Sequence, residues 1–267
     1  MHYELKKMSI FNNKFLNYNQ QIRIVVNDCD FLERVKPSAI MAYFQDAATE
    51  HAHQLGIGYA GMTARGLAWV MISMCFRVHR NPIIGEELTI KTLPLQPKNV
   101  EAIRTYYIID SHNNVVVSGS SRWCVINIKT RRIERCAPLW QGGKFDSYEY
   151  YSCQPFENAN KKIATLDIVN SKPVYSYTVQ LTDLDRNKHL NNTRYGDIFT
   201  NALGQDFLTK HTLKHFDINF AAEMFVGDTV TVFKKEIKTA NNTTETTIEA
   251  INQKDGKLVF RAMGAFE

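Results

Sequence analysis

The densest polar cluster of this chain is the decapeptide DLDRNKHLNN at 183–192, which directly follows the strand-like segment 175–181. Within it, Asp185, Asn187 and His189 are each two residues apart. Because alternate residues of an extended segment face the same side, this spacing predicts three functional groups on one surface. A carboxamide can donate to a carbonyl oxygen, an imidazole can take a proton from water, and a carboxylate can orient either group. The trio therefore suits hydrolytic acyl transfer without a nucleophilic serine.

Purely structural roles compete for the same residues. Asp and Asn favour turns and helix starts for backbone reasons, and Asn191 or Asn192 is equally a candidate for the N-cap of a helix over 193–203. A lone histidine such as His189 is more often an ordinary surface residue than a catalytic one. If the helix forms, its first N–H groups add a positive dipole end that would stabilise a developing oxyanion.

Other chemistries are poorly served by this sequence. Segment 119–123, GSSRW, lacks the GxSxG pattern of a nucleophile elbow, and neither GxGxxG nor a P-loop motif occurs. His51 and His53 are too close in sequence to share a helix face, and His211 and His215 have no adjacent third ligand. We therefore expect neither a serine nucleophile nor a metal site.

A degenerate internal repeat organises the chain. Residues 22–44 align without gaps on residues 177–199. Two aspartates coincide in this alignment, Asp28 with Asp183 and Asp30 with Asp185. The repeat therefore provides an internal comparison for the polar decapeptide.

The comparison shows that the two copies differ in chemistry. Where the second copy has Asn187 and His189, the first has Leu32 and Arg34. A purely structural turn would tolerate the same residues twice. The asymmetry therefore suggests that the second copy carries an additional function.

Each half combines one predicted helix with a run of predicted strands. In the first half, Ser38 is the candidate N-cap of a helix over 40–55, and Gly56 is its candidate terminator. The strand-like segments that follow are rich in Val, Ile, Tyr and Trp: 69–78, 86–95, 101–109 and 115–127. A helix that buries one face in an antiparallel sheet predicts an α+β unit, and two such units predict a pseudo-dimer within one chain. We expect the first unit at 1–140, a linker at 141–172 and the second unit at 173–267.

Composition excludes several classes of protein. With 22% charged residues and no long low-complexity tract, the 267-residue chain is predicted to be globular. The longest apolar stretch, 66–76, is about half of the roughly 20 residues that a membrane span needs. A net charge of +5 is too small to indicate nucleic-acid binding, and five scattered cysteines predict reduced thiols. The N-terminus has no signal or transit pattern, so a cytoplasmic location is expected.

Four separated segments resemble the acyl-ACP thioesterase family, in the bacterial form of the plastid fatty acyl-ACP thioesterases. They are LAWVMISM at 67–74, SSRWCVINIKTRR at 120–132, DRNKHLNN at 185–192 followed by Tyr195, and the predicted strand 220–228 with Glu223. The resemblance covers nearly the whole chain. It implies a double hotdog fold, in which an antiparallel sheet wraps a central helix in each half.

The resemblance also implies an activity: hydrolysis of the thioester between a fatty acyl chain and the phosphopantetheine arm of acyl carrier protein, without a cofactor. Asn187 would then polarise the thioester carbonyl, His189 and Glu223 would activate water, and Asp185 would hold Asn187 in place. Many plant members have a cysteine directly after the glutamate, where this chain has Met224. Methionine cannot supply a thiolate, so the resemblance implies attack by water, with Glu223 as base or as nucleophile left open.

The first half is expected to shape the acyl pocket. The residues expected to bind substrate are Phe44, Trp69, Met71, Met74, Asn191 and Tyr195, although core packing is the competing explanation for the apolar ones in the first half. The residues expected to bind the acidic carrier protein are Lys129, Arg131, Arg132 and Lys188, although a solvated strand end would have the same composition. Two alternatives remain: an acyl-CoA thioesterase on the same fold, and an acyl-binding protein without catalysis. The sequence leaves the preferred chain length open, and a homodimer is possible.

Overall fold

The computed structural model describes residues 16–141, 145, 149–168, 171–239 and 243–267. The chain divides into two compact units. The first unit comprises Met1–Ile24, Tyr43–Met74 and Gly85–Asn160, and the second comprises Val25–Ala42, Cys75–Ile84 and Lys161–Glu267. Two segments from the first half of the sequence therefore belong to the second unit.

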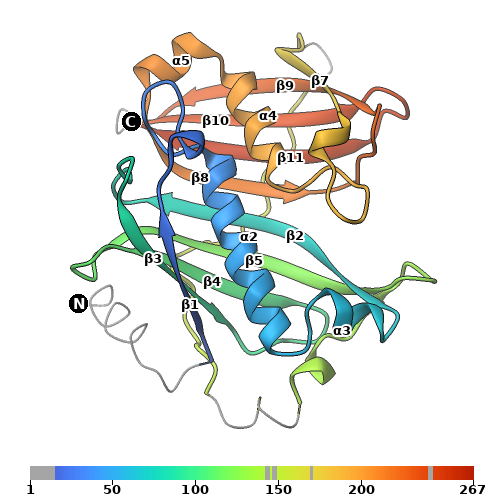
Figure 1. Cartoon of the computed structure of the whole chain (residues 1–267). Coiled ribbons are helices and arrows are strands. Elements are labelled where there is room, and N and C mark those ends of the chain that lie inside the picture. The colour runs from blue at the N-terminus through green and yellow to red at the C-terminus, as the bar shows by residue number, and fades with distance from the viewer. Residues whose placement is uncertain (1–15, 142–144, 146–148, 169–170, 240–242) are drawn as a thin grey trace. The chain divides into compact units, whose positions relative to one another are not determined.

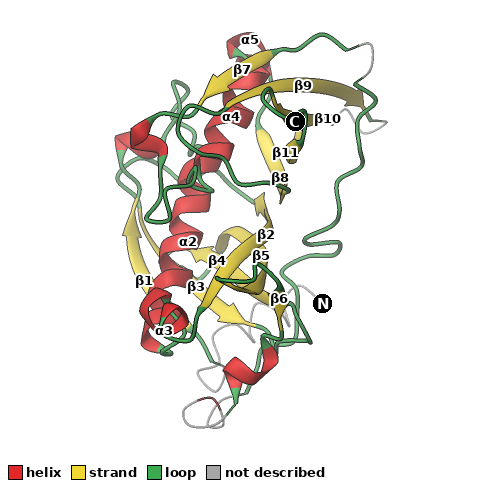
Figure 2. Ribbon diagram, turned by 90° about the vertical axis from the view of Figure 1, so that its right-hand side faces the viewer, coloured by secondary structure: helices red, strands yellow, loops and turns green. Residues whose placement is uncertain are grey.

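The first unit is an antiparallel sheet that curls around a helix (Figures 1 and 2). The strands lie in the order β1 (Tyr18–Arg23), β3 (Glu87–Pro94), β4 (Ala102–Ile109), β5 (Val115–Asn127) and β2 (Leu67–Val78). The helix is α2 (Pro37–Gln54), which is followed by the short α3 (Tyr59–Thr63); the two-residue β6 (Ile133–Glu134) pairs with β5. At one edge of this sheet, β1 pairs with β3 along the whole of Tyr18–Arg23. This is the hotdog arrangement of one sheet wrapped around one helix.

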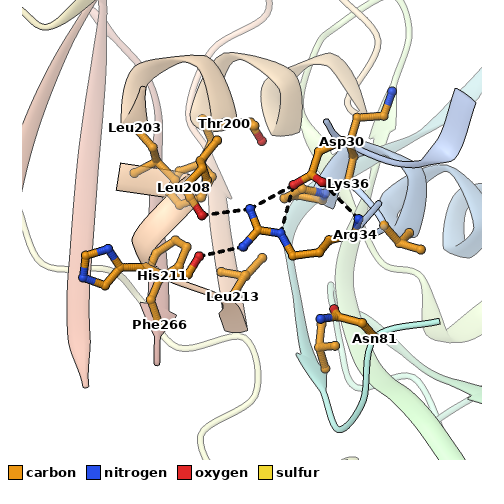
Figure 3. Close-up of a pocket in the computed structure, with 14 residues that line it drawn as sticks. Asp30, Arg34, Lys36, Asn81, Thr200, Leu203, Leu208, His211, Leu213 and Phe266 are labelled. Atoms are coloured by element: carbon orange, nitrogen blue, oxygen red, sulfur yellow. Dashed lines mark hydrogen bonds and ion pairs between the residues drawn. The ribbon is translucent and has the colours of Figure 1, made fainter. Parts of the chain in front are cut away.

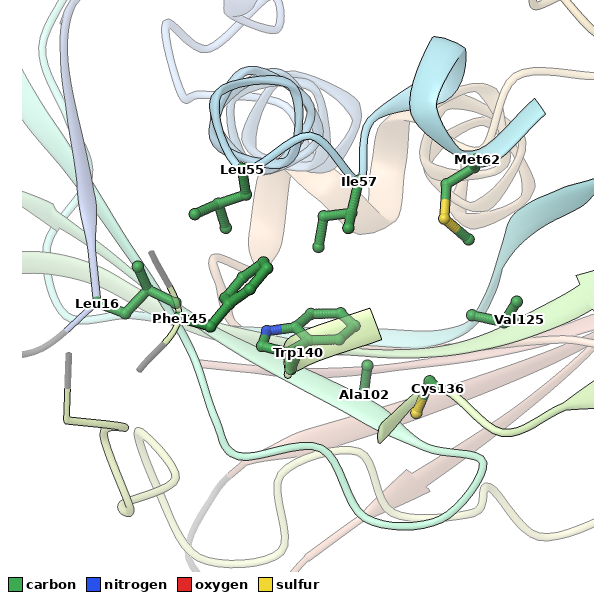
Figure 4. Close-up of a cluster of buried hydrophobic side chains, with 9 residues drawn as sticks. All are labelled: Leu16, Leu55, Ile57, Met62, Ala102, Val125, Cys136, Trp140 and Phe145. Atoms are coloured by element: carbon green, nitrogen blue, oxygen red, sulfur yellow. The ribbon is translucent and has the colours of Figure 1, made fainter. Parts of the chain in front are cut away.

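Aromatic and aliphatic side chains fill the space under α2. Phe44 of α2 is fully buried and stacks on Tyr106 of β4, with ring centroids 4.4 Å apart. A second cluster lies where α2 ends, around Trp140 (Figure 4). It contains Leu16, Leu55, Ile57, Met62, Ala102, Val125, Cys136, Trp140 and Phe145. Burial of these side chains holds the end of α2 against the strands.

The second unit repeats the pattern. Its strands lie in the order β8 (Leu213–Phe220), β11 (Leu258–Phe266), β10 (Thr244–Asn252), β9 (Thr229–Lys238) and β7 (Tyr175–Thr178). Across them lies α4 (Arg194–Leu203), followed by α5 (Gln205–Lys210). Phe199 of α4 is fully buried and packs edge-on against Phe216 of β8, at 5.0 Å between ring centroids. One helix and one antiparallel sheet in each unit confirm the α+β class.

The chain enters the second unit along the face of the sheet opposite α4. Because Phe216 points toward α4, Asn219 three residues later points to the other face. There the Asn219 carboxamide oxygen accepts from Ile163 N at 2.8 Å, and the Glu249 carboxylate accepts from Leu166 N at 3.1 Å. The connecting segment is therefore fixed to the sheet by its own backbone.

Most of the predicted first-half strands are confirmed to within two residues, and Gly56 has the left-handed φ of +73° expected of a helix terminator. Ser38 is not an N-cap, because α2 already begins at Pro37, a residue whose fixed φ suits the first helical position. In the second unit Thr193 directly precedes α4 and makes no side-chain capping hydrogen bond. The Asn191 carboxamide oxygen accepts from Thr193 N at 3.0 Å, so the side-chain contact at the helix start comes from Asn191, one of the two predicted residues. No helix in the described part of the chain combines the length and the apolar character needed to span a bilayer.

The start of α4 depends on a glycine at a close helix–helix approach within the second unit. A Cβ atom at Gly196 would lie 2.8 Å from Ser38 N and 3.0 Å from Ser38 Cα, which are backbone atoms and cannot rotate away. We expect Gly196→Val to lower the free energy of unfolding by about 1–3 kcal/mol through overpacking. Chemical denaturation measures this, with Asn201→Val at an exposed site of the same helix as control. Equal stability of the two variants would contradict the close approach.

Candidate active site

One carboxylate organises the polar loop. The Asp185 Oδ1 atom accepts from Asn187 N at 2.8 Å and from His189 N at 3.1 Å, and its Oδ2 atom accepts from Asn187 Nδ2 at 3.2 Å. Lys188 N donates to Asp185 O at 3.0 Å, and Lys188 has a φ of +64°. The segment is thus a tight turn, so the expectation of an extended strand with alternating faces is wrong. The Asp185 carboxylate holds the three groups in one loop.

A second loop brings Glu223 to this turn. β8 ends at Phe220, so Glu223 lies beyond the strand and not within it as predicted. Leu190 N donates to Met224 O at 2.8 Å, which fixes the two loops side by side. As a result, the Nδ1 atom of His189 lies 3.6 Å from the Oε1 atom of Glu223.

The His189–Glu223 pair is open on one side and apolar on the other. The two side chains are 25% and 35% exposed, so water reaches both. The Phe225 ring meets the imidazole edge-on at 5.0 Å between centroids. A partly desolvated imidazole next to a carboxylate is an arrangement that can take a proton from water.

Tyr195 and Asn191 lie beside this site. Tyr195 is 2% exposed and packs edge-on against Phe220 and Phe260. Burial, together with the negative charges of Glu223, Asp185 and Asp228, raises the pKa of the Tyr195 phenol, which therefore stays protonated. The Asn191 carboxamide oxygen accepts from Thr193 N at 3.0 Å, so this oxygen supports the start of α4.

The first copy of the repeat has the same hydrogen bonds. The Asp30 Oδ1 atom accepts from Leu32 N at 2.8 Å and from Arg34 N at 3.0 Å, and Glu33 has a φ of +58°. Asp30 N donates to Arg34 O at 2.8 Å, as Asp185 N does to His189 O. The repeat read from the sequence is thus confirmed bond by bond. We call residues 28–36 the twin loop and residues 183–191, which carry the candidate catalytic side chains, the catalytic loop.

Arg34 closes the twin loop onto α5. Its guanidinium donates to Leu208 O at 2.9 Å and to His211 O at 2.8 Å, and pairs with the Asp30 carboxylate at 3.1 Å (Figure 3). A pocket of the second unit lies around these groups and includes Asn81, which precedes Gly85 by four residues as Glu223 precedes Gly227. In the first copy, the positions that match the candidate site therefore carry Arg34 in place of histidine and Asn81 in place of glutamate. In the sequence, Arg34 was visible only as a difference from His189. Nothing there indicated its bonds to Leu208 O and His211 O.

The other predicted substrate residues lie in the first unit and are packed. Phe44, Met71 and Met74 are at most 5% exposed. Trp69 donates its Nε1–H to Ile57 O at 2.9 Å and packs edge-on against Trp140. Core packing, the competing explanation from the sequence, accounts for these contacts.

The predicted basic residues are all exposed. Lys129, Arg131 and Arg132 occupy a tight turn after β5, in which the Asn127 carboxamide oxygen accepts from Lys129 N at 3.0 Å. Lys188 lies at the tip of the catalytic loop. All four side chains therefore lie at the surface of the protein.

The histidine pairs considered as metal ligands have other contacts. His51 Nδ1 lies 2.9 Å from Arg104 Nη1, and His211 Nδ1 lies 3.0 Å from Phe207 O. His215 Nε2 lies 2.6 Å from the Asp217 carboxylate. Within the described residues, no group of three His, Cys, Asp or Glu side chains is placed to hold a metal ion.

The Arg34 contacts predict a structural role for the twin loop. Arg34→Gln removes charge-assisted hydrogen bonds to two carbonyls at the end of α5, and we expect it to lower the free energy of unfolding by about 2–4 kcal/mol. Urea denaturation measures the change. Arg186→Gln, at an exposed position of the catalytic loop, serves as control. If Arg34→Gln lowered the free energy of unfolding by less than about 0.5 kcal/mol, the stabilising role of the Arg34 contacts would be contradicted.

Comparison with known proteins agrees with this architecture. A solved acyl-ACP thioesterase from Bacteroides thetaiotaomicron has a TM-score of 0.80 at 21% identity, covering 94% of this chain and 98% of that one. The 12:0-ACP thioesterase from Umbellularia californica has a TM-score of 0.82 at 18% identity, covering 94% of both chains. At these identities the likeness shows a shared fold, the double hotdog.

Relatives in sequence are plant proteins. A chloroplastic acyl-(acyl-carrier-protein) hydrolase of Cuphea viscosissima is 26% identical over 164 residues, which cover 58% of this chain and 39% of that protein. The chloroplastic oleoyl-acyl carrier protein thioesterase 2 of Arabidopsis thaliana is 24% identical over 202 residues, covering 70% and 54%. The chain thus spans about half or less of the curated relatives it matches.

Two family descriptions account for most of the chain. The acyl-ACP thioesterase N-terminal domain matches residues 16–139, and the acyl-ACP thioesterase C-terminal domain matches residues 168–267. Both halves of the repeat are therefore covered, in the expected order. The chain belongs to the acyl-ACP thioesterase family.

Proposed function

We propose that this protein hydrolyses the thioester of fatty acyl-ACP to free fatty acid and holo-ACP, as a cytoplasmic enzyme of fatty acid biosynthesis. The observation that carries the proposal is the Asp185-ordered loop, which presents Asn187 next to a histidine whose Nδ1 atom lies 3.6 Å from the Glu223 carboxylate. A protein that only binds acyl chains has no need of these groups. Membership of the family supports the same activity.

The proposed chemistry is a direct attack by water. One Asn187 amide hydrogen is held by Asp185, which leaves the other to donate to the thioester carbonyl oxygen. Water attacks the carbonyl carbon while His189 or Glu223 takes its proton, and the oxyanion that forms is stabilised by Asn187. When the intermediate collapses, the carbon–sulfur bond breaks and the departing thiolate takes the proton. Met224, fully buried beside Glu223, supplies no thiolate for a covalent route.

The acyl chain is assigned to the interior of the first unit. Phe44, Met71 and Met74 lie in an apolar interior, and Trp69 lies at its edge. An apolar interior offers a hydrocarbon surroundings of matching polarity. Asn191 and Tyr195 are assigned to substrate binding near the reacting carbonyl.

Substitution of the catalytic loop tests the proposal. We expect Asn187→Ala and His189→Ala each to lower fatty acid release from acyl-ACP by about 10²–10⁴-fold, because an oxyanion donor or a general base is lost. Release is measured across acyl chain lengths, with acyl-CoA as a parallel substrate to test the acyl-CoA alternative. The matched control is Leu32→Ala, which changes the residue of the twin loop at the position of Asn187. Unchanged turnover in both loop variants would refute the site.

The basic turn after β5 is assigned to carrier-protein steering. We expect the triple variant of Lys129, Arg131 and Arg132 to glutamine to raise KM for acyl-ACP about fivefold and to flatten its salt dependence, because exposed charges act through screened attraction. Steady-state kinetics at several ionic strengths measure this. Acyl-pantetheine, which has no carrier protein, is the control substrate. A KM increase of the same size with acyl-pantetheine would exclude a docking role.

A further inference from the structure

A positive charge is buried inside the first unit. Arg104 of β4 is 7% exposed. Tyr106, two residues later on the same strand, stacks on Phe44 of α2, so Arg104 also faces the helix. Its cross-strand neighbours are Pro94 of β3 and Ser121 of β5, which carry no charge. Arg104 therefore lies in the interior to which the acyl chain is assigned.

Only one nitrogen of this guanidinium has partners within the described residues. The Nη1 atom donates to His51 Nδ1 at 2.9 Å and to Thr92 Oγ1 at 3.2 Å, which uses both of its hydrogens. His51 and Thr92 thus fix the orientation of the guanidinium. The Nε and Nη2 atoms of Arg104 have no hydrogen-bond or ion-pair partner in the described part of the chain. Their N–H groups form the edge of a guanidinium that matches a carboxylate with two parallel hydrogen bonds.

This arrangement is unfavourable without a counter-charge. Burial lowers the pKa of Arg104, but a guanidinium keeps its proton at neutral pH. Removing an unpaired charge from water costs far more than burying a neutral side chain, and no carboxylate among the described residues pairs with Arg104. A neutral side chain of similar size would fill the same space without this cost. The buried, unpaired guanidinium therefore indicates an anion that the chain itself does not supply.

We propose that Arg104 binds a carboxylate that is carried on an alkyl chain inside the first unit. The carboxylate matches the Nε and Nη2 edge, and the alkyl chain matches the apolar interior around Phe44. Two compounds present this chemistry: an acyl substrate with a second carboxylate at its far end, and the fatty acid that hydrolysis releases. That an acyl chain occupies this interior rests on the proposed function, whereas the binding of a carboxylate at Arg104 is tested without turnover.

Calorimetric titration of the full chain with saturated fatty acids, and with the primary alcohols of the same lengths, tests the inference. We expect the wild type to bind the acid about tenfold more tightly than the alcohol, because only the carboxylate makes the two charge-assisted bonds. Arg104→Met should abolish this preference and leave binding of the alcohol unchanged. Arg104→Lys keeps the charge without the planar edge and should retain only part of the preference. A wild type that does not prefer the acid, or a preference that survives in Arg104→Met, would overturn the inference.

Arg122 of β5 provides the matched control. It directly follows Ser121, so it faces the opposite side of the sheet, and its Nη1 atom lies 3.6 Å from the Oε1 atom of Glu101. Arg122→Met should leave the preference for the acid at its wild-type value. Urea denaturation separates ligand binding from a structural role: the midpoint of Arg104→Met should not fall, because an unpaired buried charge is removed. A lower midpoint with an unchanged preference for the acid would show a structural role and overturn the inference.

Hydrolysis distinguishes the two sources of the carboxylate. The substrates are pantetheine thioesters of a fatty acid and of the dicarboxylic acid of the same length. If the substrate supplies the carboxylate, wild-type kcat/KM should be about tenfold higher for the dicarboxylic thioester, and Arg104→Met should remove the difference. If the wild type shows no such difference but still binds the acid more tightly than the alcohol, the released fatty acid is the ligand. A wild type that hydrolyses no thioester would overturn the proposed function and leave the titration as an independent test of Arg104.

Discussion

In each of the two matched loops, one aspartate carboxylate accepts two backbone hydrogen bonds and so fixes the turn. Asp185 accepts from the N–H groups two and four residues later, and Asp30 does the same in the twin loop. Aspartate is suited to this role because its short side chain reaches its own following backbone. The bonds force the fourth residue, Lys188 or Glu33, into the left-handed region. Everything that the catalytic loop can do depends on this turn, because it sets where the Asn187 and His189 side chains begin.

The twin loop has the same turn but lacks the asparagine and the histidine of the other loop. Arg34 takes the position of His189, and its longer side chain reaches the carbonyls of Leu208 and His211. A guanidinium that is satisfied by backbone carbonyls and a carboxylate is a stabilising contact, not a base. The two copies thus differ: the twin loop binds the end of α5 through Arg34, whereas the other loop places His189 next to Glu223. This is a physical reason for one reactive site on a duplicated framework.

The candidate site is made by two loops of the second unit, both from the C-terminal half of the sequence, although the unit itself collects segments from both halves. Residues 25–42 and 75–84 belong to this unit together with the C-terminal half. The catalytic loop and the loop of Glu223 meet through the single backbone bond from Leu190 N to Met224 O. This bond places His189 next to a carboxylate that lies 34 positions away in the sequence. The Phe225 ring meets the imidazole edge-on, and the buried Tyr195 lies beside the pair.

The sequence by itself determined the α+β class, the repeat and most first-half strands, because period-two apolar patterns and shared aspartates are local signals. It also pointed to Asp185, Asn187 and His189. The reason was an expected extended segment, whereas the structure brings these residues together in a turn. Only the tertiary structure decided that Glu223 lies in a loop beside His189 and that Arg34 binds the end of α5. These outcomes depend on hydrogen bonds between segments far apart in the chain, for which no local pattern in the sequence is a guide. The spacing of residues along the chain placed Asp185, Asn187 and His189 in one loop. Only a contact with a distant loop brought Glu223 next to His189.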